Sequence, residues 1–172
     1  WGIKDPRLCR LLPFWLPILE ELDSTPHFII IARHPYEVAA SLKRRDDLLQ
    51  EHSLWLWLTY MLEAELATQN YPRVFVTYDE LLADWQATVT KIATTLQLQW
   101  PNPVTSRAPQ VNEFLKPSLK HHQVSAEEVT RTDELSRWSQ TVYQAMNYAT
   151  HGEKESLKQL DTIRRALLGY AK

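Results

Sequence analysis

Apolar residues recur at helical spacing along most of this chain, and continuous apolar runs are confined to two short segments. The helical spacing predicts helices over residues 8–22, 36–45, 53–69, 84–98, 133–150 and 152–170, with a single helical turn at 79–82. The runs HFIIIA at 27–32 and RVFVTY at 73–78 are rich in β-branched and aromatic residues. Such runs are typical of strands buried on both faces of a parallel sheet. We also expect Trp1–Lys4 to be the end of a strand.

The segment between the fourth long helix and the C-terminal helices has a different character. Residues 99–117 hold four prolines, so we expect this stretch to be irregular. A long connection of this kind in a compact domain is often functional. Beyond it, Ser125 and Glu128 have the spacing of a capping box, which predicts a short helix.

The order of these elements predicts the fold class. Strand, helix, helix, strand and helix is the alternation of an α/β protein whose helices cover a parallel sheet. We therefore expect a three-layer α/β fold with a helical C-terminal part, in a single domain over residues 1–172. Because the chain begins with Trp rather than Met, we interpret it as a fragment. Residues N-terminal to it would then supply at least one more strand.

Composition narrows the class of protein further. The chain has 172 residues, 44% of them hydrophobic, and a net charge of −2, which is a globular composition and lacks the basic excess of a nucleic-acid binder. Its one cysteine, Cys9, excludes an internal disulfide and a cysteine-based zinc site, and we expect no metal. No apolar run is long enough for membrane insertion, and no signal peptide is visible. We expect a cytoplasmic protein.

Glycine is scarce, with only three in the whole chain. A loop that wraps a phosphate needs glycines close together, and neither GxGxxG nor GxxxxGK[ST] occurs. If the chain binds a nucleotide, either that loop lies outside it or the phosphate is held in another way.

Cationic side chains follow two of the expected strands. Lys4 and Arg7 come after the first, and Arg33 comes after the second, with Ser41 eight residues later in the next helix. Ligands of open parallel sheets gather at the carboxyl ends of the strands. A guanidinium there and a hydroxyl on the following helix could both reach one phosphate, because the planar fork of Arg pairs with two phosphate oxygens.

The segment IIIARHPYEVAASL, which contains Arg33, Pro35 and Ser41, resembles the 3′-phosphate-binding motif of sulfotransferases. Three further segments are similar to parts of bacterial sulfotransferase-family proteins and occur in the same order: WGIKDPRLCRLLPFW, VFVTYDELLADW and PSLKHH. The resemblance covers residues 1–122, which would be a sulfotransferase-like core, and leaves residues 123–172 as a helical tail.

The resemblance implies both a fold and an activity. The fold would be a partial sulfotransferase fold, similar to P-loop nucleotide kinases. The activity would be transfer of a sulfonate group from PAPS (3′-phosphoadenosine 5′-phosphosulfate) to a hydroxyl or amine of a small-molecule or carbohydrate acceptor, releasing PAP. Arg33 and Ser41 would hold the 3′-phosphate, and Lys4 would act in catalysis on the transferred group. The remaining donor contacts would come from Arg7, Tyr78, Lys116 and Lys120.

The family's loop for the 5′-phosphosulfate is missing here, and its general base would lie upstream. We therefore expect this chain alone to be inactive. Two alternatives stay open: a nucleotide or sugar kinase of related architecture, and a non-catalytic sulfotransferase-like interaction module. For Arg33 and Ser41 the ordinary interpretation is a surface arginine and a solvated helical serine.

Overall fold

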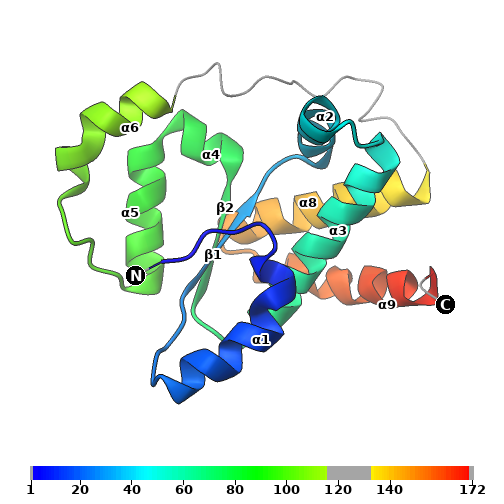
Figure 1. Cartoon of the computed structure of the whole chain (residues 1–172), viewed down its shortest axis with the longest axis horizontal. Helices are drawn as coiled ribbons and strands as arrows, with labels where there is room; N and C mark the ends of the chain where they lie inside the picture. Colours follow the sequence, from blue (N-terminus) through cyan, green and yellow to red (C-terminus); the bar gives the residue numbers. More distant parts are fainter. Residues whose placement is uncertain (1, 116–132, 171–172) are drawn as a thin grey trace.

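The computed structural model describes residues 2–115 and 133–170, and helices take up 70% of these residues against 7% in strands. The strands are β1 (Phe28–Ala32) and β2 (Arg73–Thr77). The α-helices are α1 (Leu8–Glu21), α2 (Pro35–Asp46), α3 (Gln50–Ala67), α4 (Tyr78–Ala83), α5 (Trp85–Leu96), α6 (Ala108–Phe114), α8 (Glu134–Thr150) and α9 (Leu160–Tyr170). Two short 3₁₀ helices are η1 (Val104–Arg107) and η3 (Lys154–Gln159). Figure 1 shows both strands running toward the end of the molecule where α2 and α4 begin.

The expected three-layer α/β sulfotransferase fold, similar to P-loop nucleotide kinases, is wrong for the described part of the chain. Its sheet has two parallel strands, with Phe28 opposite Arg73 and Ala32 opposite Thr77. Residues 2–4, expected to end a further strand, have no regular structure. The physical reason is that only the two β-branched runs form strands, while a layered parallel fold needs several strands side by side.

One face of the sheet lies in the main hydrophobic core. Ile30 and Ala32 of β1 and Phe75 of β2 are buried there. Figure 1 shows α8 crossing behind the strands, and α3 and α9 beside it. These three helices contribute Leu54, Leu58, Leu62, Val142, Ala145, Met146, Leu160 and Ile163 to the same core. The C-terminal helices are therefore part of the packing that holds the strands.

In the part of the chain that the structure describes, a helix covers the opposite face over β2. Val74 and Val76 pack against Ile92 and Leu96 of α5. The residues beside them on β1 are Ile29 and Ile31, which are 42% and 47% exposed. The expectation that both faces of the first apolar run are buried is therefore wrong at alternate positions.

Residues 104–114 correct another expectation, because they form η1 and α6 where an irregular segment was predicted. Pro109 lies in the first turn of α6. Proline is well tolerated at that position, since its missing N–H would have no partner within the helix and its φ is already helical. The same residue type that breaks a helix interior therefore starts this helix.

A buried ion-pair network connects α3, β2 and α9. Glu65 is 2% exposed, and its carboxylate lies 3.0 Å from the guanidinium of Arg73 and 2.5 Å from that of Arg164. Gln69 donates a further hydrogen bond to Glu65 at 3.1 Å. The network links residues far apart in sequence, so it fixes the position of α9 against the strands.

Candidate anion-binding site

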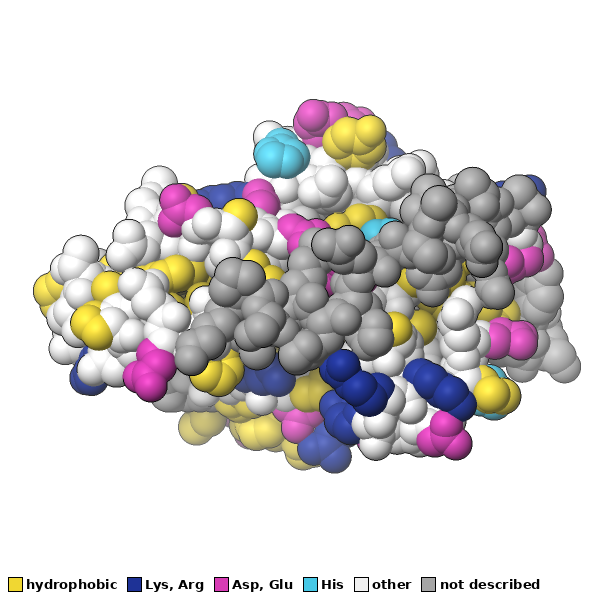
Figure 2. All heavy atoms as spheres, turned by 90° about the horizontal axis from the view of Figure 1, so that it is seen from above, with side chains coloured by type: hydrophobic (Ala, Val, Ile, Leu, Met, Phe, Trp, Pro, Cys, Tyr) yellow, Lys and Arg dark blue, Asp and Glu magenta, His cyan; other side chains and the backbone are white. Residues whose placement is uncertain are grey.

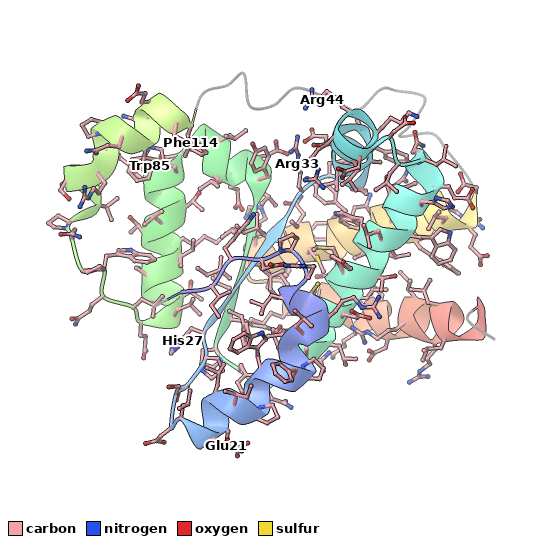
Figure 3. The ribbon with its side chains drawn as sticks, in the orientation of Figure 1. Glu21, His27, Arg33, Arg44, Trp85 and Phe114 are labelled. Carbon is pink, nitrogen blue, oxygen red and sulfur yellow. The ribbon has the colours of Figure 1, made fainter. Side chains whose placement is uncertain are left out.

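Arg33 is the first residue after β1, and its backbone is held by the core. The indole Nε1 of Trp57, a buried residue of α3, donates a hydrogen bond of 3.1 Å to the Arg33 carbonyl oxygen. The α2 helix begins two residues later at Pro35, again with proline in the first turn. Figure 3 shows the labelled Arg33 at the carboxyl end of β1, between α2 and α4. The backbone of Arg33 is therefore held in place where the chain turns from β1 into α2.

Among the described residues, the Arg33 guanidinium contacts Glu37 and Tyr78. Its Nε donates to Glu37 Oε2 at 3.1 Å, and its central carbon lies 4.5 Å from the centre of the Tyr78 ring. The side chain of Glu37 is 4% exposed and that of Arg33 is 23% exposed. A cation over an aromatic face and an ion pair with a carboxylate four residues away are both attractive, and together they restrict the guanidinium to one orientation.

The terminal nitrogens of Arg33, Nη1 and Nη2, form no hydrogen bond within residues 2–115 and 133–170. Because Glu37 contacts Nε and Tyr78 lies against a face of the guanidinium, the outer edge with Nη1 and Nη2 is the part left for a ligand. That edge presents two parallel N–H groups, the geometry that pairs with two oxygens of a phosphate or carboxylate. The arrangement can therefore bind an anion.

Ser41 lies on the same side of α2 as Glu37, one turn further along the helix. Its side chain is partly exposed, and its hydroxyl forms no hydrogen bond in the described part of the chain. The structure thus places Glu37 and Ser41 one helical turn apart on α2, and Arg33 ahead of that helix. Of the residues predicted from sequence, it brings Arg33 and Tyr78 into contact and puts Ser41 on the adjoining helix.

Tyr78 is the first residue of α4, not the last residue of the strand. A capping box holds the start of this helix: Thr77 Oγ1 accepts from the Glu80 backbone at 3.1 Å, and the Thr77 backbone donates to Glu80 Oε2 at 2.8 Å. Lys91 of α5 also donates to Glu80 at 3.2 Å. Burial favours the neutral form of Glu80, but the hydrogen bonds from Thr77 and Lys91 outweigh it and lower the pKa of this carboxyl.

We expect Glu80→Ala to lower the free energy of unfolding by about 1 kcal/mol at pH 7, because the backbone N–H of Thr77 loses its acceptor in the capping box and Lys91 loses its partner. Since the folded pKa of Glu80 lies below its ordinary value of 4.5, this stabilisation is present above that pH and is lost as pH falls through the folded pKa. Denaturant unfolding at pH 7 and pH 3 measures both effects. The control is Glu51→Ala, an exposed acidic residue in the first turn of α3. An equal loss at both pH values would contradict the expectation.

The other predicted cations lie apart from this cluster or outside the described residues. Lys4 is exposed, and in the described ranges it forms no hydrogen bond or ion pair with Arg33, Ser41 or Tyr78. Arg7 is 72% exposed and pairs with Asp5 at 2.8 Å. That hydrogen-bonded pair lowers the pKa of Asp5 to about 2. The remaining predicted donor contacts, Lys116 and Lys120, lie outside the described residues, as does the capping box predicted at Ser125.

Two residues of the site were missed from sequence. Glu37 follows Arg33 by four residues, and this charge spacing could have found it. Trp57 is 24 residues from Arg33, and no local signal connects them.

A separate pocket lies near the same end of the sheet. It has a volume of about 150 Å³ and is lined by His34, Gln140, Tyr143 and Gln144. The His34 ring also meets the Tyr143 ring edge to face at 4.8 Å. His34 lines this pocket and contacts Tyr143 of α8, whereas Arg33 contacts Tyr78 of α4. The pocket is therefore distinct from the Arg33 cluster.

Charged groups near this end are mostly paired. Figure 2 looks onto it and shows Lys and Arg side chains gathered on the lower part of the view. On the last turn of α2, Lys43 pairs with Asp47 and Arg45 with Asp46, which leaves Arg44 as an exposed cation there.

No group of three His, Cys, Asp or Glu within residues 2–115 and 133–170 could hold a metal ion. None of the described helices combines the length and apolar character that crossing a membrane requires.

Comparison of the chain with protein-family models, with curated proteins and with solved structures finds no match.

Proposed function

We propose that Arg33 binds the 3′-phosphate of PAPS, and that the chain carries the corresponding part of the donor site of a sulfotransferase. The observation that supports this most directly is the geometry of the guanidinium, whose Nη1–Nη2 edge has no partner among the described residues while Glu37 and Tyr78 hold its other sides. Ser41 is the second ligand of the phosphate in this proposal. The proposal also assigns contact with the adenine to the Tyr78 ring, which lies against Arg33.

The proposed reaction is an in-line displacement at sulfur. An oxygen or nitrogen of the acceptor forms a bond to the sulfur, and the bond between sulfur and the bridging oxygen of the 5′-phosphate breaks. The electron pair leaves with PAP, and the acceptor proton passes to a base outside the Arg33 cluster. Charge builds up on the bridging and equatorial oxygens, and cations placed there stabilise it. We assign that role to Lys4, an exposed residue ahead of α1.

The chain's share of the donor site is limited by its scarcity of glycine. With three glycines and no phosphate loop, it has no backbone segment suited to wrap the 5′-phosphosulfate. The proposal therefore assigns the 3′-phosphate side to this chain. The acceptor is a small molecule or carbohydrate that presents a hydroxyl or amine.

Ligand-induced thermal stabilisation tests the proposal. We expect PAP to raise the melting temperature of the chain more than 5′-AMP does, because only PAP carries the 3′-phosphate. At 100 times its dissociation constant a ligand stabilises the fold by about 2.7 kcal/mol. ATP serves as the comparison for a kinase. A larger rise in melting temperature with ATP than with PAP would favour the kinase. No rise with any nucleotide would contradict both the sulfotransferase and the kinase proposals.

A non-catalytic interaction module is the second candidate, and one observation favours it. Ile29 and Ile31 leave apolar surface open on β1, next to a strand edge that pairs with nothing else among the described residues. Exposed apolar surface of this kind often marks a protein contact. Absence of nucleotide binding together with self-association or partner binding that Ile31→Lys abolishes would support this candidate.

A further inference from the structure

The buried carboxylate of Glu37 has a clear structural relation to the candidate phosphate ligand. Glu37 lies in the first turn of α2, and its side chain is 4% exposed. Its Oε2 accepts a hydrogen bond from Arg33 Nε at 3.1 Å. A carboxylate this close to a phosphate site repels the ligand, so its presence needs a physical explanation.

The explanation lies in which edge of the guanidinium Glu37 contacts. A guanidinium can present two edges to an oxyanion: the side edge with Nε, and the end edge with Nη1 and Nη2. The contact with Glu37 lies on the side edge. The Tyr78 ring lies against the guanidinium at 4.5 Å. Rotation about the last bonds of Arg33 would break one of these two contacts, so the end edge stays directed toward the ligand position.

We propose that Glu37 is a positioning residue, which holds Arg33 so that the Nη1–Nη2 edge meets a terminal phosphate of the nucleotide. The inference rests on the proposed function, because it takes the ligand to be the 3′-phosphate. The acceptor oxygen of residue 37 does the positioning, and its negative charge is not needed. Two variants separate these properties: Glu37→Gln keeps an acceptor oxygen without the charge, and Glu37→Ala removes both.

PAP binding by wild type and both variants gives the first test. We expect Glu37→Ala to weaken PAP binding about tenfold, the loss typical of one hydrogen bond to a charged group. Glu37→Gln binds PAP as well as wild type or better, because the repulsion between carboxylate and phosphate is gone. Glu63→Ala, in α3, is the matched control and leaves binding unchanged. Melting temperatures without ligand show that each variant is folded.

A direct readout of Arg33 gives the second test and needs no ligand. A hydrogen-bonded Nε–H of Arg33 gives a resolved, slowly exchanging signal in ¹⁵N NMR. We expect this signal in wild type and in Glu37→Gln, and we expect Glu37→Ala to lose it. Because Glu37→Gln keeps the hydrogen bond, it keeps the inference testable even if Glu37→Ala does not fold.

The possible failures are distinguishable. If wild type does not bind PAP, the proposed function fails and the inference fails with it. If wild type binds PAP and a folded Glu37→Ala binds it equally well, only the inference is overturned. A folded Glu37→Gln that has lost both the NMR signal and the binding also overturns the inference, since the acceptor oxygen would then not suffice.

Discussion

Glu65→Ala is expected to lower the free energy of unfolding by about 3–5 kcal/mol, the largest effect we predict. The carboxylate is 2% exposed and pairs with Arg73 and Arg164, whose side chains are 13% and 15% exposed. Removing it leaves two largely buried guanidinium groups close together without their shared counter-charge. Breaking a buried pair from one side is costly for this reason, even where the intact pair contributes little net stability.

Denaturant unfolding of purified variants measures this effect. Glu65→Gln keeps a hydrogen-bond acceptor but not the charge. We therefore expect it to lower the free energy of unfolding by less than Glu65→Ala does. The control is Glu63→Ala, on the same helix, whose partner Arg10 is 57% exposed. Exposed pairs of this kind contribute about 0–1 kcal/mol. Equal losses for Glu63→Ala and Glu65→Ala would show that the buried network does not hold α3, β2 and α9 together.

Arg33→Ala is expected to have the largest effect on binding, raising the dissociation constant for PAP about 30-fold or more. Truncating one partner of a hydrogen-bonded charge pair typically costs about 2–5 kcal/mol, and each 1.4 kcal/mol is about a factor of ten. The variant loses the end edge of the guanidinium and leaves Glu37, 4% exposed, without this ion pair. The remaining carboxylate then repels the phosphate.

Two matched variants separate the geometry of Arg33 from its charge. Arg33→Lys keeps a positive charge but lacks the planar fork, so it cannot contact Glu37 and two phosphate oxygens in the same way. We expect it to bind PAP more weakly than wild type and more tightly than Arg33→Ala. Arg44→Ala removes an exposed cation from α2, the helix that follows Arg33, and should change the dissociation constant less than threefold; Figure 3 labels both residues. A comparable loss in Arg44→Ala would indicate attraction by general surface charge.

Both strands and the longer helices could be predicted because their signals are local, whereas the segment that forms η1 and α6 was expected to be irregular. The apolar spacing of 8–22 and the β-branched run of 73–78 correspond to α1 and β2, with small differences at the ends. The number of strands and the layers could not be predicted in the same way. They depend on how segments pair across the chain, and the expected layered sheet assumed pairing partners that the described residues do not provide.

In the candidate site too, some contacts have a signal in the sequence and others depend on how distant segments pack. The contact between Arg33 and Tyr78 follows from the parallel pairing of β1 and β2, because residues just after paired strands lie side by side. The Thr77–Glu80 capping box has the same spacing as the one predicted at Ser125, but it overlaps the β-branched run that predicts a strand up to Tyr78. The hydrogen bond from Trp57 to Arg33 has no such signal, since it depends on how α3 packs against the strand end.

The central claim is that Arg33 binds a 3′-phosphate, and a calorimetric titration of wild type and Arg33→Ala with PAP and with 5′-AMP tests it most directly. We expect wild type to bind PAP at least tenfold more tightly than 5′-AMP, and Arg33→Ala to lose this preference while it stays folded. Equal affinity of wild type for the two nucleotides, or a preference for PAP that survives in Arg33→Ala, would contradict it.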